Sequence, residues 1–299
     1  MLLATVERRA VLSEAVASAR AQGARVALVP TMGFLHEGHL SLVDRARAAA
    51  DYTVVSIFVN PLQFGPHEDL ATYPRDLDRD LDLLRRRGAD LVFVPDVAEM
   101  YPAREPGVYV HAPALADRLC GASRPGHFQG VLTVVAKLLH VAAPDVAVFG
   151  RKDLQQLVLV RRMVRDLDFG VRIIAGAIVR DADGLALSSR NVYLTAAQRE
   201  QALLLSRGLV AARDAFAAGE RDAARLVGTA RGMLERGTDV RVDYVELIDT
   251  TTLDAVARAS PQDALAVAAW VGRTRLIDNI TIGGHDVEQV ENGEEDERS

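Results

Sequence analysis

Short apolar runs alternate with stretches of helical spacing along the first 180 residues of the chain. The runs cover 26–29, 53–59, 89–94, 146–149 and 171–179, and most of them stop at Pro, Asn or Gly. Such runs are typical of buried strands in a parallel sheet. Between them, apolar residues recur at intervals of three and four, which predicts helices at 11–22, after residue 39, and at 76–87, 131–142 and about 154–167.

This alternation predicts an α/β fold with an open parallel sheet. Beyond residue 180 the order changes: helices are expected at 195–218 and 221–235, followed by strands at 240–248, 264–271 and 276–282. A second, smaller α+β domain is therefore expected. We place the domains at 1–179 and 180–284, with an acidic tail at 285–299.

The net charge of −6 comes from the end of the chain. Seven of the 41 acidic residues and one of the 35 basic residues lie within 285–299, so the rest has 34 of each. A neutral body argues against nucleic-acid binding and against a basic membrane face. We expect the tail to be disordered and solubilising.

Cellular location is indicated by three features of the sequence. The single cysteine, Cys120, excludes an internal disulfide and suits a reducing compartment. Glu7 and Arg8 interrupt what would be the apolar core of a signal peptide. No apolar run reaches the ~20 residues that a membrane span needs. We therefore expect a cytoplasmic protein.

The stretch LVPTMGFLHEGHLSL at 28–42 predicts a strand, a glycine turn and a helix with His36 and His39 at its entrance. The first turn of a helix offers unpaired N–H groups and a positive dipole end, which favour phosphate. Gly33 and Gly38 allow a ligand to approach the backbone closely. Two alternatives stay open: the histidines only cap a helix, or they chelate zinc, which would need a third ligand.

Three more turns carry candidate site residues. Gln63 follows a strand in NPLQFG and suits a polar substrate, although a surface turn explains it equally well. Lys152, one of only two lysines, lies where a strand ends and a helix begins, a place that offers a cation no structural benefit but suits triphosphate. The run from Ser188 to Arg190 suits closure over phosphates. Arg124 and His127, in a long irregular stretch at 101–129, are candidates for an anionic ligand.

With these segments in view, the chain resembles the pantoate–β-alanine ligase family from near its first residue to about 283. The resemblance is carried, in family order, by PTMGFLHEGH, SIFVNPLQF, YPRDL, GASRPGHFQGV, FGRKDLQQL, DGLALSSRN and AAWVGRTRLIDN. It implies a Rossmann-like, doubly wound ATP-binding domain, a smaller C-terminal domain and a homodimer. It also implies a two-step reaction with Mg²⁺, in which ATP and pantoate form pantoyl adenylate and β-alanine then displaces AMP.

The resemblance implies roles for individual residues. His36, His39, Lys152 and Arg190 would be catalytic, while Gln63 and Gln156 would bind pantoate. ATP would be bound by Met32, Gly33, Phe34, Leu35, His36, Glu37, Gly38, His39, Gly150, Arg151, Lys152, Asp153, Val179, Leu187, Ser188, Ser189 and Arg190. The family pattern has an acidic residue before the lysine, where this chain has Arg151. Asp80 is a candidate for a water-mediated Mg²⁺ contact, although its place near a helix start explains it equally well.

Two rival functions use the same phosphate-binding turn. One is another adenylyltransferase, which makes a dinucleotide or activates an amino acid; the other is a nucleotide-binding regulatory module without turnover. The ligase interpretation requires four separate turns, those of His39, Gln63, Lys152 and Arg190, to meet at one edge of a single sheet.

Overall fold

The structure is a computed structural model that describes residues 3–103 and 106–284. The chain divides into two compact units: one holds the chain up to Arg151 with Leu159–Gly176, and the other holds Lys152–Val158 with the chain from Ala177 onward. The predicted domain boundary between residues 179 and 180 stays a prediction, because compact units need not coincide with domains. The predicted acidic tail at 285–299 lies outside the described residues.

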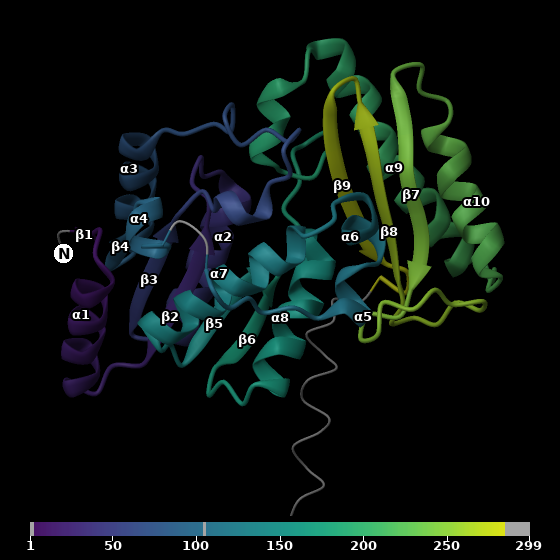
Figure 1. Ribbon diagram of the computed structural model, residues 1–299. Helices are drawn as coiled ribbons and strands as arrows, with labels where there is room; N and C mark the ends of the chain where they lie inside the picture. The colour runs from purple at the N-terminus through teal and green to yellow at the C-terminus, as the bar shows by residue number, and fades with distance from the viewer. Residues whose placement is uncertain (1–2, 104–105, 285–299) are drawn as a thin grey trace, which may run out of the picture. The chain divides into compact units, whose positions relative to one another are not determined.

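The first unit contains a six-stranded sheet in which all neighbouring strands are parallel. Its spatial order is β1-β4-β3-β2-β5-β6, as Figure 1 shows. The strands are β1 (Ala4–Val6), β2 (Val26–Thr31), β3 (Tyr52–Ile57), β4 (Leu91–Phe93), β5 (Val146–Gly150) and β6 (Arg172–Gly176). Except at the edges, these strands are almost continuously buried, which explains their unbroken apolar runs.

The strand order reverses beside β2. The chain runs from β2 outward through β3 to β4, and then returns to β5 on the other side of β2. Ala27 and Leu28 of β2 pair with Val146 and Ala147 of β5. In open α/β sheets, ligands bind where the order reverses, outside the carboxyl ends of the strands. The segments that follow Thr31 and Gly150 leave the sheet at this point.

Helices cover both faces of this sheet. The helices α1 (Arg9–Ala21) and α7 (His127–Ala142) pack together on one face, and α2 (Glu37–Ala49) and α3 (Leu77–Arg87) pack together on the other. The doubly wound parallel sheet that was predicted is thus confirmed. On the second face, apolar residues of α2 and α3 form a buried core with β2, β3, β4 and β5.

Close packing of α2 depends on a glycine at the end of β6. A Cβ atom on Gly176 would lie 2.0 Å from Cδ2 of Leu42. Leu42 is itself buried on α2. Because the glycine has no side chain, Leu42 can pack against the end of β6 and α2 can lie close to β5 and β6.

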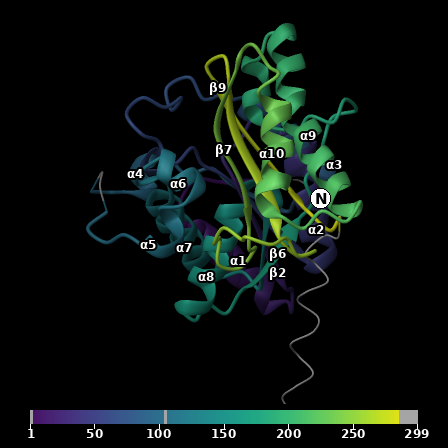
Figure 2. The same ribbon diagram turned by 90° about the vertical axis from the view of Figure 1, so that its right-hand side faces the viewer.

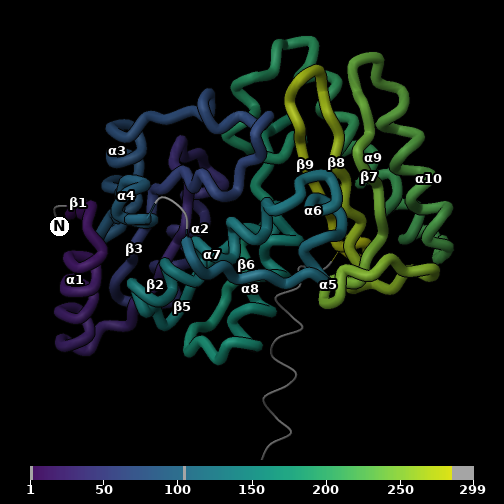
Figure 3. Tube along the Cα trace, in the orientation of Figure 1, coloured from purple at the N-terminus to yellow at the C-terminus, as the bar shows by residue number. Residues whose placement is uncertain are grey.

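The stretch 101–129, expected to be irregular, contains two short helices, α5 (Pro113–Ala116) and α6 (Leu119–Ser123), and the beginning of α7. The Cα trace in Figure 3 follows this segment from β4 and α4 (Val97–Met100) to α7. Helices of four or five residues leave no periodic pattern in a sequence, so the prediction missed them. Cys120 lies buried in α6.

The second unit is the smaller α+β part that the sequence predicted. Its antiparallel sheet has the order β7 (Val240–Ile248), β8 (Ala264–Val271) and β9 (Thr274–Thr281). Figure 2 shows α9 (Ala196–Ala217) and α10 (Ala223–Leu234) beside this sheet. A single buried cluster joins the apolar residues of both helices to one face of the three strands.

Candidate active site

The turn after β2 is shaped by hydrogen bonds at its base. Oγ1 of Thr31 donates to the carbonyl oxygen of Ser56 at 2.8 Å and accepts from the N–H of Gly33 at 3.2 Å. Gly33 has φ of +79°, and a Cβ atom there would lie 2.9 Å from Cγ2 of Ile57. Only glycine fits this conformation and this space. The glycine therefore lets the turn pack tightly against Ile57 of β3 and Asp80 of α3.

A buried carboxylate holds the next part of this turn. The N–H groups of Phe34 and Leu35 donate to Oδ2 and Oδ1 of Asp80, at 2.6 and 2.7 Å. Asp80 is only 1% exposed. Burial raises the pKa of Asp80 above its ordinary value, although the two N–H donors act in the opposite direction. Through these contacts, Asp80 anchors the turn after β2 to α3. A contact of Asp80 with Mg²⁺ stays a prediction.

The two histidines meet at the start of α2. His36 is the N-cap residue, and its N–H donates to Nδ1 of His39 at 3.4 Å. Their ring centroids are 4.1 Å apart. In the neutral tautomer whose Nδ1 accepts this bond, the ring proton of His39 is on Nε2. A donor at the N-terminus of a 13-residue helix suits an anionic ligand.

Two of the residues predicted to bind ATP, Glu37 and Gly38, make contacts with other parts of the protein. The Glu37 carboxylate pairs with the Arg87 guanidinium of α3, which also contacts Asp44 at 2.7 Å. The carbonyl of Gly38 accepts a hydrogen bond from Oγ of Ser41 at 2.9 Å. These contacts join α2 to α3 and stabilise the first turn of α2.

Gln63 ends a short 3-10 turn, Pro61–Gln63, just after β3, and it is buried. Its Oε1 accepts a hydrogen bond from Nδ2 of Asn60 at 3.1 Å, and its Nε2 lies 3.2 Å from Sδ of Met32. Two residues for which different substrates were predicted, Met32 for ATP and Gln63 for pantoate, are thus in contact.

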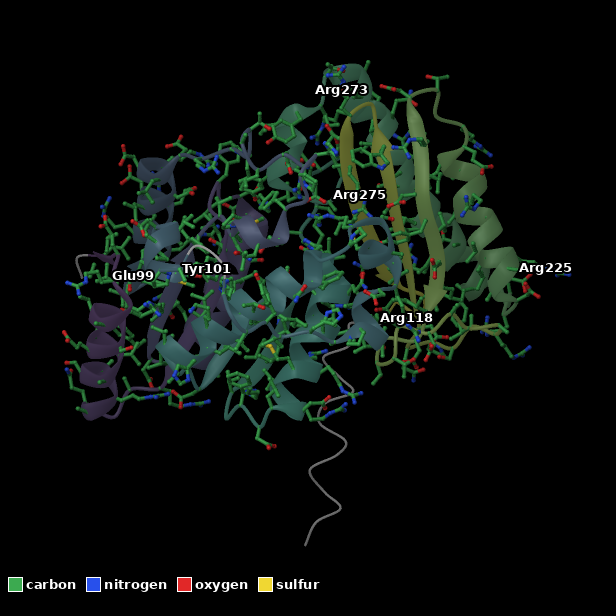
Figure 4. The ribbon with its side chains drawn as sticks, in the orientation of Figure 1. Glu99, Tyr101, Arg118, Arg225, Arg273 and Arg275 are labelled. Carbon is green, nitrogen blue, oxygen red and sulfur yellow. The ribbon has the colours of Figure 1, made fainter. Side chains whose placement is uncertain are left out.

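Asn60 is in turn held by a phenol. The hydroxyl of Tyr101 donates to Oδ1 of Asn60 at 2.9 Å, and Nδ2 of Asn60 also donates to the carbonyl of Gly130 at 3.1 Å. Figure 4 labels Tyr101, which directly follows α4. Burial, together with the neighbouring Tyr109, raises the pKa of the Tyr101 phenol, so it stays a proton donor. The sequence analysis singled out neither Asn60 nor Tyr101.

Arg124 and His127 contact the protein itself rather than presenting a free cation. Arg124 donates from Nε and Nη2 to the two carboxylate oxygens of Glu68, at 2.7 and 2.5 Å. Its Nη1 lies 3.0 Å from Nε2 of His127, and Nδ1 of His127 lies 2.8 Å from the carbonyl oxygen of Gln63. The anion that meets Arg124 is thus Glu68, and the cluster fixes the backbone of Gln63.

In the second unit, the remaining candidates lie on two segments. Lys152 is half-buried, and its carbonyl oxygen accepts a hydrogen bond from Nδ2 of Asn279 at 3.1 Å. The N–H of Leu187 donates to the carbonyl of Val179 at 3.0 Å, which closes a hairpin. Oγ of Ser188 then accepts the N–H of Arg190 at 3.3 Å and begins a 3-10 turn, Ser189–Tyr193.

Within each unit, the structure therefore brings some predicted residues together. In the first unit, Met32 contacts Gln63 and His36 contacts His39. In the second unit, Val179 contacts Leu187 and Ser188 contacts Arg190. Gln156 is half-buried on α8 (Leu154–Asp166), where its neighbour Gln155 is buried. Gly150 ends β5, Arg151 is buried and Asp153 is exposed.

Among residues 3–103 and 106–284, no three His, Cys, Asp or Glu side chains group together in a way that could hold a metal ion. The zinc alternative for His36 and His39 thus finds no third ligand there. Mg²⁺ that accompanies a nucleotide needs only one or two carboxylates, since phosphate oxygens and waters complete its shell. Any Mg²⁺ of the reaction would in that case be held mainly by the phosphates.

No helix within the described residues is both long enough and apolar enough to cross a membrane.

Comparison with known proteins accounts for almost all of the chain. The family model of pantoate–β-alanine ligase matches residues 4–281. Pantothenate synthetase of Moorella thermoacetica is 52% identical over 271 residues, which cover 91% of this chain and 95% of that protein. Pantothenate synthetase of Thermotoga neapolitana is 50% identical over 282 residues, with 94% and 99% covered.

Solved structures agree with the sequence matches. A crystal structure of pantothenate synthetase from Thermus thermophilus has a TM-score of 0.88 and 45% identity, covering 93% of this chain and 99% of that one. A pantoate–β-alanine ligase from Francisella tularensis, complexed with β-γ ATP and β-alanine, has a TM-score of 0.77 and 30% identity, with 94% and 98% covered. The chain belongs to the pantoate–β-alanine ligase family.

Proposed function

We propose that this chain condenses pantoate with β-alanine in two steps that consume one ATP. In the first step, the pantoate carboxylate attacks the α-phosphorus of ATP, which gives pantoyl adenylate and releases pyrophosphate. In the second, the neutral amine of β-alanine attacks the acyl carbonyl carbon and AMP leaves, so that an amide bond forms. The family membership of the chain supports this reaction.

ATP is bound, in this proposal, by the turn and helix start from Met32 to His39. The turn leaves the sheet where the strand order reverses, which is the usual place for a nucleotide in such folds. The N–H groups and the positive dipole end at the start of a helix attract phosphate oxygens. Nε2–H of His39 adds one directed donor, since its Nδ1 is already occupied by the N–H of His36.

Pantoate is bound, in this proposal, by Gln63 together with Gln156. Oε1 of Gln63 accepts from Asn60 and one N–H of Nε2 donates to Sδ of Met32, so the second N–H of Nε2 is the donor proposed to meet a substrate oxygen. The contact between Gln63 and Met32 supports a pantoate position next to the nucleotide turn.

Positioning and charge stabilisation carry the adenylation step. Holding the carboxylate in line with the α-phosphorus can supply about 7–11 kcal/mol of the barrier. Lys152, His39 and Arg190 are proposed to stabilise the negative charge that passes to pyrophosphate. Mg²⁺, when bound to the phosphates, would neutralise part of the same charge. Gly150, Val179 and the segment Leu187–Ser189 are proposed to complete the contacts with the nucleotide.

No side chain of the enzyme needs to act as a nucleophile, because the adenylate is the activated intermediate. The buried position of Cys120, in a helix that carries none of the proposed site residues, agrees with this. The role of the protein in the second step is to keep water away from the adenylate and to orient the amine.

The observation that carries the residue assignment is the contact between Met32 and Gln63 beside the start of α2. The test is AMP formation from ATP and pantoate, with and without β-alanine, combined with pyrophosphate exchange. Exchange that depends on pantoate, and release of AMP that depends on β-alanine, are expected. Exchange that depends instead on nicotinate mononucleotide or an amino acid would support another adenylyltransferase. ATP binding without AMP formation would support a regulatory module.

Assembly and location belong to the same proposal. We expect a homodimer, as the family resemblance implies, and light scattering of the purified protein tests it. A cytoplasmic location is supported by the single cysteine, which suits a reducing compartment.

A further inference from the structure

The sequence RTRLIDN, which occurs in one of the family motifs, has no role in the reaction as proposed. It corresponds to residues 273–279 and forms most of β9. Its last two residues, Asp278 and Asn279, are polar but only 4% and 3% exposed. Buried polar side chains are costly unless they are hydrogen-bonded, so their partners show what they hold in place.

Asn279 holds the backbone of Lys152. Its Nδ2 donates to the Lys152 carbonyl oxygen at 3.1 Å, across 127 residues of sequence. Both residues belong to the second unit. Because a lysine side chain has four rotatable bonds, the direction in which its ammonium group points depends first on a fixed backbone. The bond to Asn279 supplies such a restraint just before α8 begins at Leu154.

Asp278 holds the other nucleotide segment through Arg180. Nη1 and Nη2 of Arg180 donate to Oδ2 and Oδ1 of Asp278, at 2.6 and 2.9 Å. Nη1 also donates to the carbonyl of Gly184 at 3.1 Å. A two-pronged pair of this kind fixes direction as well as distance. Arg180 therefore ties the tip of its own hairpin to β9.

That hairpin carries proposed ATP contacts on both strands. Arg180 pairs with Ala186 in an antiparallel bridge, and the adjacent residues Val179 and Leu187 are joined by a hydrogen bond. The chain continues directly to Ser188 and Arg190. Two neighbouring residues of one strand thus hold the two segments of this unit that are proposed to bind the triphosphate.

We propose that Asp278 and Asn279 are positioning residues of the adenylation step. Asn279 fixes the backbone from which Lys152 extends, and Asp278 fixes, through Arg180, the hairpin that leads to Ser188–Arg190. This role rests on the function proposed above for Lys152 and for the hairpin. Neither residue needs to touch a substrate.

Asn279→Ala gives the first test. The pantoate-dependent pyrophosphate exchange rate should fall about 10- to 100-fold, the size of effect that a displacement of about 1 Å in an active site produces. The KM for ATP should change much less than kcat, because the nucleotide turn after β2 is unaltered. Asp278→Asn should instead raise the KM for ATP several-fold, since the hairpin that contacts the phosphates loses its anchor.

Asp263→Ala is the matched control for a purely structural loss. Asp263 is 5% exposed in the same unit, and its Oδ2 accepts the N–H of Ser260 at 2.7 Å, in a turn that carries none of the proposed site residues. It should lower the melting temperature and leave kcat unchanged. If Asp263→Ala lowers kcat as much as Asn279→Ala at equal loss of stability, the positioning role is wrong.

A double-mutant comparison separates this inference from the function on which it rests. Lys152→Ala keeps the backbone carbonyl, so Asn279→Ala removes the same hydrogen bond in either background. Single turnovers with labelled ATP, followed over hours, keep slow variants measurable. Positioning predicts that Asn279→Ala adds no further loss to Lys152→Ala, whereas an equal loss in both backgrounds overturns it. Wild-type rates for Lys152→Ala would instead overturn the proposed role of Lys152.

Discussion

Nδ2 of Asn60 lies 3.1 Å from Oε1 of Gln63 and donates a hydrogen bond to it. This bond fixes the orientation of the Gln63 amide. An amide that can rotate freely offers either a donor or an acceptor on a given side, whereas the bond from Asn60 fixes Oε1 on the side of Asn60. The donor end then lies toward Met32. In the proposed function, this orientation lets a Gln63 N–H meet an oxygen of pantoate.

Replacing Gln63 by Ala should weaken pantoate binding far more than ATP binding. Loss of a hydrogen bond to a charged group costs about 1.5–3 kcal/mol, which is about 10- to 100-fold in affinity. The KM values for pantoate and for ATP, measured in the same exchange assay, provide the check. An unchanged KM for pantoate would remove Gln63 from the site.

Tyr101→Phe tests whether the hydrogen bond from Tyr101 to Asn60 helps to orient the amide of Gln63. The variant leaves Oδ1 of Asn60 without the Tyr101 donor, so the orientation of both amides becomes less well fixed. We expect the KM for pantoate to rise by about 5- to 30-fold, equivalent to about 1–2 kcal/mol, with little change for ATP. Tyr109→Phe is the control, because that neighbouring phenol is exposed. An equal change in the KM for pantoate in the two variants would contradict the idea that Tyr101 orients Gln63 through Asn60.

Gly33→Ala should disrupt the nucleotide turn. The new Cβ would lie 2.9 Å from Cγ2 of Ile57 and 3.1 Å from Oδ2 of Asp80, at a φ of +79°. Gly23 has nearly the same φ, +82°, but nothing lies within 4 Å of its Cβ position. Gly23→Ala should therefore lower the free energy of unfolding only by the strain of a left-handed residue, about 1–3 kcal/mol. Gly33→Ala should lower the affinity for ATP as well. Equal ATP affinity in the two variants would refute the role of the turn.

The main sheet could be predicted from the sequence because its strands are buried on both faces. Runs such as 26–29 and 146–149 have no polar interruption, and each corresponds to a strand. β1 was missed, since its three residues Ala4–Val6 are mostly exposed and carry no pattern. The strand expected at 171–179 ends at Gly176, because Val179 pairs with Leu187 in a hairpin instead.

Candidate residues on turns could be found because each turn carries a recognisable motif next to a strand end. Their supports could not be found in this way. Tyr101 is 41 residues from Asn60, and Asn279 is 127 residues from Lys152. Such pairs are created only by tertiary folding, and one sequence holds no signal for them. Arg124 was expected to meet an external anion, since the sequence could not show that Glu68 reaches it.

The Glu68–Arg124 pair should make stability depend on pH in the acid range. Burial acts to raise the pKa of Glu68, but the hydrogen bond and charge of Arg124 outweigh it, so the pKa lies below the ordinary 4.5. A carboxyl group with a lowered pKa in the folded state stabilises the protein above pH 4.5, and this contribution is lost as the pH falls through the folded-state value. The pair therefore stabilises the protein at neutral pH and ceases to do so in acid.

Glu68→Gln should consequently lower the free energy of unfolding at pH 7 by about 1–3 kcal/mol, and the difference from wild type should shrink below pH 4.5. Urea denaturation at a series of pH values measures both quantities. Asp166→Asn is the control, since Asp166 is an exposed partner of Arg162 on α8 and should change the profile less. If the prediction holds, the difference in the free energy of unfolding between Glu68→Gln and wild type does not stay constant from pH 7 into the acid range. A constant difference would show that the ionised pair does not hold the loop of Gln63 against α7.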